Sequence, residues 1–435
     1  MTGKMCHRLR ILLISVLLSF LSLHAVSANE VTPPMPEADY STGTISLPYA
    51  FFNENFGFAA GYVRSVTGYP QRQATILGTV IAGTKGSALG FLSGFDLLIP
   101  GSDRLFVDPI ASIGYFSDAE GYIDGNPDFA DERAGSHDSH KDNFVDGDGW
   151  DYFYRVRVKY LLPIGSGRDE IIQTFNLQGG LPQEAHLEER SCNPLSSGRS
   201  YVELMPFYRS QEINSDDVDV ELKTNGLELG LFWDNRDFPS SPSRGNSWHA
   251  KLTRDFGWMD SSDSWTSVSG EVDHYVPLVL SGTFRQSVLA FNLWSSYSMS
   301  WDEVSTRVIK HRPPAFSGST LGGLWRMRGF PTQRFSDKAA IYYASELRLI
   351  PRWNPFDQWP QLQKHIGVEW LQFVPFAELG RVSPSWNVPE LHSEMKWCAG
   401  VGLRLWAKGI VVRIDTAVSD ESVGVQMMVN QPFQF

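Results

Sequence analysis

Apolar and polar residues alternate with a period of two along most of this chain. Between 289 and 301, apolar or aromatic side chains fill one parity, while Asn292, Ser296, Ser298 and Ser300 fill the other. A period of two places successive side chains on opposite faces of a β-strand, whereas an amphipathic helix repeats every 3.6 residues. The helical period is almost absent, so the pattern predicts an all-β protein.

The minority parity also carries charge. The segment from Ile341 contains Glu346 and Arg348 between apolar residues, and the segment after Gly409 contains Arg413 and Asp415 in the same way. Two charged residues two positions apart lie on the same face of a strand, so one face is polar and hydrated while the other is apolar. In lipid every backbone polar group needs an internal partner, which without helices only a closed sheet provides. We therefore predict a transmembrane antiparallel β-barrel.

Sixteen alternating segments form this barrel, an even number as in single-chain bacterial barrels. They are 44–53, 56–66, 72–83, 86–98, 104–117, 149–162, 200–210, 221–234, 246–257, 263–277, 282–300, 339–349, 366–378, 395–407, 409–418 and 421–435. With a periplasmic N-terminus, the long connections 118–148 and 301–338 fall outside the cell. The connection 163–199 is then an unusually long periplasmic turn, for which the sequence offers no reason.

The N-terminus predicts export. Lys4, Arg8 and Arg10 precede an apolar run over 11–23 and the small residues at 26–28, the pattern of a secretory signal peptide over 1–28. Residues 29–43 then form a short periplasmic leader, and 44–435 form the barrel. Only Cys192 and Cys398 follow the cleavage site, and we expect no disulfide between them because one lies in a turn and the other in a strand.

Several chemistries are disfavoured. Asp142, Asp146 and Asp148 lack the spacing of a calcium loop, so we predict a solvated acidic loop and no metal. No nucleophile motif is present, and His249 and His274 lie in predicted strands without distinctive spacing, which predicts a protein without enzymatic activity. A net charge of -12 and the lack of a basic run disfavour nucleic acid as a partner. We expect no cofactor.

One motif lies within the long connection 301–338. Arg328, Gly329 and Phe330 occur in a Pro-containing, non-strand segment, and loops of this length are uncommon unless functional or disordered. A guanidinium presents a rigid fork of donors that suits a carboxylate in a confined space. Gly329 permits a backbone turn that a side chain would block. We predict a loop folded inward onto a carboxylate.

These residues resemble a known family. The Arg328-Gly329-Phe330 loop, the turn from Trp233 through Asp234, Asp237 and Pro239 to Gly245, the block Phe376-Ala377-Glu378-Leu379-Gly380, and the strands around Arg404 and Arg413 are similar to the barrel of the bacterial surface antigen family, the BamA/TamA type. The resemblance is strongest over 221–435. We expect Asp234, Asp237 and Gly245 to shape a tight turn.

The resemblance implies a sixteen-strand barrel whose sixth outer loop enters the lumen, where its arginine pairs with an acid on an inner strand. Carried over, Arg328 is that arginine and Glu378 the acid, in place of the aspartate usual in the block. A buried lumen charge without a partner would be costly, which agrees. Further lumen charges could extend the network or simply line a wet lumen; they are Glu346, Arg348, Arg404, Arg413 and Asp415.

The chain ends on alternating apolar residues, with Phe433 and Phe435 in the same parity as Val429. This ending suits a last strand that closes in the interfacial aromatic girdle. We expect this strand to meet residues 44–52 at a seam, the weak point of the barrel.

The resemblance implies an outer-membrane protein that acts in protein assembly or translocation, with outer-membrane lipid and unfolded outer-membrane proteins as partners. The family's periplasmic POTRA domains are not expected here, since only a short leader precedes the first strand, so a separate periplasmic partner could supply them. Their absence favours an alternative, a passive channel or surface antigen that keeps the barrel without insertase activity. A hydrolase using lumen-facing groups is a third, weaker hypothesis.

Overall fold

A computed structural model describes residues 43–53, 55–183, 192–280, 282–304, 308–360, 363, 366–429, 431 and 433. The signal peptide and almost all of the leader lie outside these residues. The barrel strands are β1 (Gly43–Asn53), β2 (Gly57–Thr67), β3 (Thr75–Gly83), β4 (Ala88–Phe95) with β5 (Leu97–Leu98), β6 (Leu105–Gly121), β7 (Val145–Leu161), β10 (Arg199–Asn214), β11 (Asp219–Asp234), β12 (Gly245–Asp255), β13 (Trp265–Pro277), β14 (Phe284–Ser298), β19 (Ala339–Pro351), β20 (Val368–Ser383), β21 (Lys396–Ala407), β22 (Ile410–Ser419) and β23 (Val423–Val429).

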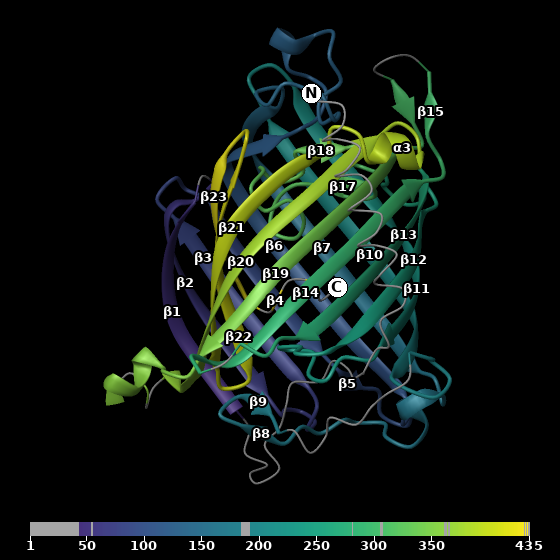
Figure 1. The fold of residues 1–435 in the computed structure, drawn as a ribbon. Coiled ribbons are helices and arrows are strands. Elements are labelled where there is room, and N and C mark those ends of the chain that lie inside the picture. Colours follow the sequence, from purple (N-terminus) through teal and green to yellow (C-terminus); the bar gives the residue numbers. More distant parts are fainter. Residues whose placement is uncertain are drawn as a thin grey trace, which may run out of the picture.

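Each of these strands pairs antiparallel with its neighbour in the chain, and the sheet curls into a barrel (Figure 1). β4 and β5 both pair with β6, so they are one strand interrupted at Asp96, which has a φ of 54°. The described residues thus form sixteen strands, which confirms the predicted fold class. Within these residues β1 touches β23, but no backbone ladder joins them, so the barrel is nearly closed.

The two faces of the wall differ as the alternation predicts. Apolar side chains stand exposed on the outer surface of strands all around the barrel, for example Val80, Leu92, Leu229, Val272, Val401 and Val425. The lumen instead holds charged side chains that are at most 2% exposed: Arg328, Glu346, Arg348, Glu378, Arg404, Arg413 and Asp415. The outer surface therefore suits lipid, and the interior is polar.

The two ends of the barrel carry different connections (Figure 1). One end, here called the loop end, carries 122–144 with η1 (Pro127–Phe129), 299–338 with β15 (Asp302–Glu303), β16 (Ile309–Lys310), β17 (Thr320–Leu321) and β18 (Phe335–Ser336), and α3 (Val388–Leu391). The predicted loop 118–148 thus begins and ends within β6 and β7. The opposite turn end carries η2 (Gly165–Arg168), β8 (Leu177–Gln178), β9 (Leu181–Pro182) and η4 (Pro355–Gln358). Among the described helices, none has the length and apolar character needed to cross a membrane.

The chain's end departs from the prediction. β23 stops at Val429, and Phe433, at a φ of 68°, lies in the lumen with 3% of its surface exposed. Its ring lies 5.7 Å from the Arg348 guanidinium, and Gln431 accepts a hydrogen bond from Arg404. These lumen partners turn the chain inward, so the prediction of Phe433 in the aromatic girdle is wrong. Phe435 lies outside the described residues.

Candidate functional site

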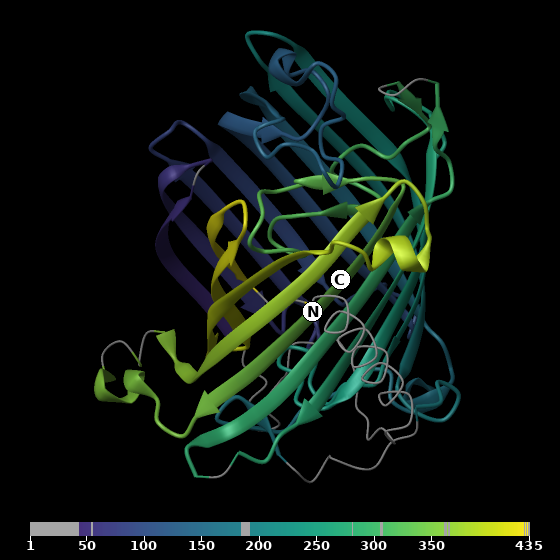
Figure 2. The same ribbon diagram turned by 45° about the horizontal axis from the view of Figure 1, so that its top comes forward.

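The connection between β14 and β19 enters the barrel. In Figure 2, which brings the loop end forward, its hairpin of β17 and β18 lies within the ring of strands. Leu321, Met327, Phe330 and Phe335 are at most 3% exposed and pack with wall residues such as Tyr342. The loop is therefore a packed plug and not a solvated excursion.

Arg328 grips Glu378 with two different groups. Its backbone N–H donates to Oε2 at 2.6 Å, and its Nε donates to Oε1 at 2.7 Å. Tyr342 donates to the same Oε1 at 2.8 Å, and the unpaired thiol of Cys398 donates to Oε2 at 3.0 Å. The carboxylate of Glu378 thus receives four donors in a site closed to solvent, which offsets the cost of burying its charge.

The same guanidinium reaches two further carboxylates. Nη1 donates to Asp415 Oδ2 at 2.7 Å, and Nη2 lies 2.9 Å from Glu346 Oε1. Glu346 also receives Arg404 at 2.8 Å and Arg348 at 2.9 Å. Three carboxylates from β19, β20 and β22 therefore converge on one loop arginine, and the charged side chains placed in the lumen by parity form one network.

Aromatic faces take up part of the remaining positive charge, since the network holds four arginines against three carboxylates. The guanidinium carbon of Arg328 lies 3.6 Å from the centre of the Phe376 ring, and that of Arg413 lies 5.6 Å from Trp325. Cation–π contacts of this kind gain strength where the cation is removed from water. The Phe376 ring thus packs against the guanidinium of Arg328.

Two glycines leave room for the loop. A Cβ on Gly329 would lie 2.6 Å from Cys398 Cβ and 3.0 Å from the Val418 carbonyl carbon. A Cβ on Gly380 would lie 2.9 Å from both Leu321 Cδ1 and Met327 Sδ. The left-handed backbone in this region belongs to Met327, at a φ of 60°, and not to Gly329. The glycine of the motif is therefore required by close approach to the wall and not by its own turn.

Further contacts fasten the plug to the loop end. Arg334 donates to Glu421 at 2.6 Å and to Ser139 Oγ at 2.9 Å, while Arg133 pairs with Asp337 at 2.5 Å. Nothing in the alternation marks these residues, because they lie in irregular segments whose partners depend on the tertiary fold. Tyr342 and Cys398, by contrast, share the inward parity of Glu346 and Arg404 and could have been found by it.

The turn between β11 and β12 is shaped by its two aspartates. Asp237 accepts hydrogen bonds from the backbone N–H groups of Phe238 at 3.0 Å and Ser243 at 2.8 Å, while Asp234 accepts from the backbone and side chain of Arg236. Burial raises the pKa of Asp237, an effect that its hydrogen bonds oppose. Gly245 begins β12 at a φ of 97°. Both carboxylates have structural partners here.

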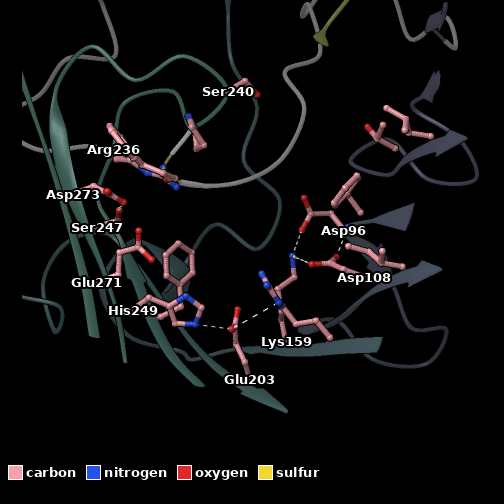
Figure 3. A pocket seen from close by; sticks show the side chains of 18 of the residues that line it. Asp96, Asp108, Lys159, Glu203, Arg236, Ser240, Ser247, His249, Glu271 and Asp273 are labelled. Carbon is pink, nitrogen blue, oxygen red and sulfur yellow. Dashed lines mark hydrogen bonds and ion pairs between the residues drawn. The ribbon is translucent and has the colours of Figure 1, made fainter. Parts of the chain in front are cut away.

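A second polar region lies below the plug. A cavity of about 160 Å³ is lined by charged side chains of β6, β7, β10 and β12 to β13 (Figure 3). Lys159 bridges Asp96 and Asp108 at 2.6 and 2.8 Å, and His249 pairs with Glu203 at 2.9 Å. Ser247 donates to Asp273 at 2.9 Å. The histidine and the serine are thus each engaged with a different carboxylate, which gives no support to a hydrolase.

The described residues contain no group of three His, Cys, Asp or Glu side chains placed to hold a metal ion. Asp148 instead accepts a hydrogen bond from Tyr115 at 2.6 Å.

Fold and lumen together define an all-β, nearly closed antiparallel barrel of the transmembrane kind with an inward-folded loop. The chain is similar in structure to CdiB from Escherichia coli (TM-score 0.55, 13% identity, covering 89% of this chain and 62% of that one). Weaker similarities are to CdiB from Acinetobacter baumannii (0.49, 11%, 89% and 59%) and to BamA from Haemophilus ducreyi lacking POTRA domains 1-3 (0.46, 12%, 90% and 70%). No protein-family model and no curated protein sequence matches the chain. At such identities the likeness concerns the fold.

Proposed function

We propose that this chain is an outer-membrane β-barrel of the BamA/TamA type that acts in the assembly or translocation of proteins, with the turn end in the periplasm. The observation that carries the proposal is the combination of a clamped lumen loop with an unpaired seam. One feature holds the barrel in shape from within. The other is the place in the wall where, among the described residues, no ladder joins the two edge strands, which leaves these edges for pairing with another chain.

The clamp supports this proposal by its placement. Arg328 contacts Glu346 on β19, Glu378 on β20 and Asp415 on β22. All three strands lie near the C-terminal side of the seam. The loop therefore braces the wall that ends in β23, while it makes no comparable set of ion pairs with β1 to β4 within the described residues.

The seam supports the proposal by its weakness. β23 has seven residues, against seventeen in β6 and in β7, and a strand that spans a bilayer needs about 9–11. Gln431 and Phe433 lie in the lumen, so the described chain does not extend β23 along the wall. β1 pairs with β2 along its whole length, but within the described residues its other edge has no ladder with β23. An exposed strand edge is a template for pairing with a further strand, which suits a client polypeptide that enters at the seam.

A passive channel or surface antigen is the alternative. The described lumen holds the plug and the C-terminal residues Gln431 and Phe433, which disfavours an open pore in this conformation. Planar-bilayer conductance, measured beside the folding rate of an unfolded outer-membrane protein in the same vesicles, separates the two functions. Solute flux without faster client folding would support the alternative.

Photocrosslinking tests the seam directly. Benzoylphenylalanine at Val425 on β23 is compared with the same group at Leu229 on β11, since the two side chains are 53% and 52% exposed on the outer face. We expect a client to crosslink at position 425 and not at 229. Equal crosslinking at both positions, or none at 425, would contradict the proposal. Co-purification would identify a periplasmic partner.

A further inference from the structure

The long connection between β7 and β10 crosses the mouth of the barrel at the turn end. Its first described part, residues 163–183, is here called the strap. It leaves the wall at β7 and reaches β20 and β21, where Trp370 Nε1 donates to the Gly180 carbonyl at 2.9 Å. In the order of strands, five lie between β10 and β20 on one side and seven between β7 and β21 on the other. The strap therefore lies close to a diameter of the mouth.

The base of the strap is fixed by two arginines of the wall. Arg104 donates to the carbonyl oxygens of Gly167 at 2.7 Å and Arg168 at 2.9 Å. Arg199, which is 1% exposed, donates to those of Glu170 at 2.7 Å and Ile171 at 2.9 Å. Hydrogen bonds that a charged donor makes to a carbonyl oxygen are stronger than those made by a neutral donor. The strap thus has a defined path from its first residues.

The tip is fixed by two tryptophans and an arginine. It is the tight turn between β8 and β9, where Gly179 and Gly180 have φ values of 54° and 71°. Arg285 of β14 donates to the Gln178 carbonyl at 3.0 Å. A Cβ on Gly180 would lie 2.5 Å from Trp406 Cδ1 and 2.8 Å from Trp370 Nε1. The tip is therefore pressed against the two rings.

The middle of the strap packs over the turn between β11 and β12, which lines one side of the polar cavity described above. The rings of Phe175 and Phe238 lie 5.1 Å apart, and Phe238 lies 5.5 Å from Trp406, which stacks on Trp370. These rings belong to one buried apolar cluster with Leu181, Ile350 and Val411. Pro239 and Ser240, next in the chain to Phe238, line the cavity (Figure 3). The cluster thus separates the cavity from the turn end.

We propose that the strap is a second closure of the lumen, independent of the plug that Arg328 fixes near the loop end. Among the described residues, the strap is held by Arg104, Arg199 and Arg285, whereas the plug is held through Arg328 and Arg334. Because these anchors differ, either closure can be displaced while the other stays. The lumen is then a chamber that becomes accessible when either closure moves and conducts only when both have moved. This inference holds whatever polypeptide the barrel handles.

The experiment displaces each closure alone and then both together, because access needs one closure to move and conduction needs both. Gly180→Glu displaces the tip, because its Cβ meets Trp406 and its charge would be buried against two rings. Gly282→Glu is the matched control, since Gly282 lies in the turn before β14 at a φ of 82° with nothing within 4 Å of its Cβ. Arg328→Ala displaces the plug. Circular dichroism in vesicles checks that each variant keeps its sheet. If one does not fold, Phe175→Ala replaces Gly180→Glu, and Gly329→Ala replaces Arg328→Ala.

Access is measured with Ser240→Cys in a Cys192→Ser background, a hydrophilic maleimide and peptide mapping, which separates labelling at position 240 from labelling of the free thiol of Cys398. Conductance is measured in planar bilayers. We expect Gly180→Glu and Arg328→Ala each to speed labelling several-fold over the parent, whereas Gly282→Glu does not. Conductance should rise several-fold only in the Gly180→Glu/Arg328→Ala double variant. Unchanged labelling in folded Gly180→Glu, or full conductance in Arg328→Ala alone, would overturn the proposal.

Discussion

Arg328 holds Glu378 by main chain and side chain at once, with its N–H on one carboxylate oxygen and its Nε on the other. This arrangement fixes the loop backbone as well as the guanidinium. It engages both carboxylate oxygens of Glu378 at once.

Substitutions of Glu378 should separate charge from reach. Glu378→Gln keeps the length but offers one acceptor oxygen, so one buried donor of Arg328 is left unpaired, at a cost of about 1–3 kcal/mol or more for a charged group. Glu378→Asp keeps the charge but is a methylene shorter. We expect both to lower the temperature at which the folded form disappears on gels, Gln more than Asp. Glu369→Gln, on the outer face of β20, is the control. A small change in this temperature for Glu378→Gln together with a large one for Glu378→Asp would refute the role of charge.

Gly329→Ala should undock the loop. The added Cβ meets Cys398 Cβ and the Val418 backbone, and neither is the far end of a flexible side chain. We expect proteolysis within 301–338 to become faster, with a loss of stability of about 1–3 kcal/mol, as for other overpacked sites. Gly270→Ala is the control, because nothing lies within 4 Å of its Cβ. Equal proteolysis of both variants would show that close approach does not matter.

Acid should loosen the 118–148 loop through His137. This ring is 6% exposed and donates to the Glu394 carbonyl, and burial, followed by the nearby Arg381 and Lys396, lowers its pKa although Asp138 opposes the shift. A lowered folded pKa means that the contribution is complete above the ordinary value of 6.5 and is lost as the pH falls through the folded pKa. Proteolysis of the loop should therefore be faster at about pH 5 than at pH 7.5.

His137→Gln keeps a donor without a titrating ring and should remove this dependence. His140→Gln, at an exposed histidine of the same loop, should retain it. A pH dependence that survives His137→Gln would assign the effect to another group.

The position of Phe433 can be tested with a larger ring. An interfacial girdle accepts tryptophan readily, whereas the lumen site against Arg348 is filled. We expect Phe433→Trp to lower the urea midpoint of unfolding, at a cost of about 1–3 kcal/mol for overpacking. Val423→Trp, on the outer face of β23, should be tolerated. A stable Phe433→Trp would favour the girdle position instead.

The sequence predicted the sixteen strands because alternation is local and each wall segment records its own two faces. It also predicted that Glu346, Arg404 and Asp415 face the lumen. It could not predict that they meet Arg328, since register between strands is not written in either strand alone. The pairing of Arg328 with Glu378 came from resemblance and not from the residues themselves.

Two features of the structure could not be predicted from the sequence, and the physical reason is the same for both. Phe433 keeps the outward parity of β23 in the sequence, but its surroundings in the lumen, Arg348 and the neighbours of Gln431, come from distant strands. The sequence offered no reason for the long connection that contains the strap. Trp370 and Trp406, which contact Gly180 at its tip, lie about 190 and 226 residues after that glycine in the chain. Long-range partners of irregular segments need the fold.

Arg328 is the residue through which the lumen loop is clamped to the wall. Removing one partner of a buried ion pair costs about 3–5 kcal/mol, and here three carboxylates lose their shared cation. We therefore predict that Arg328→Ala loses the fast-migrating, unboiled form on a gel and becomes sensitive to protease within 301–338. Unchanged mobility together with an intact loop after protease treatment would contradict the account.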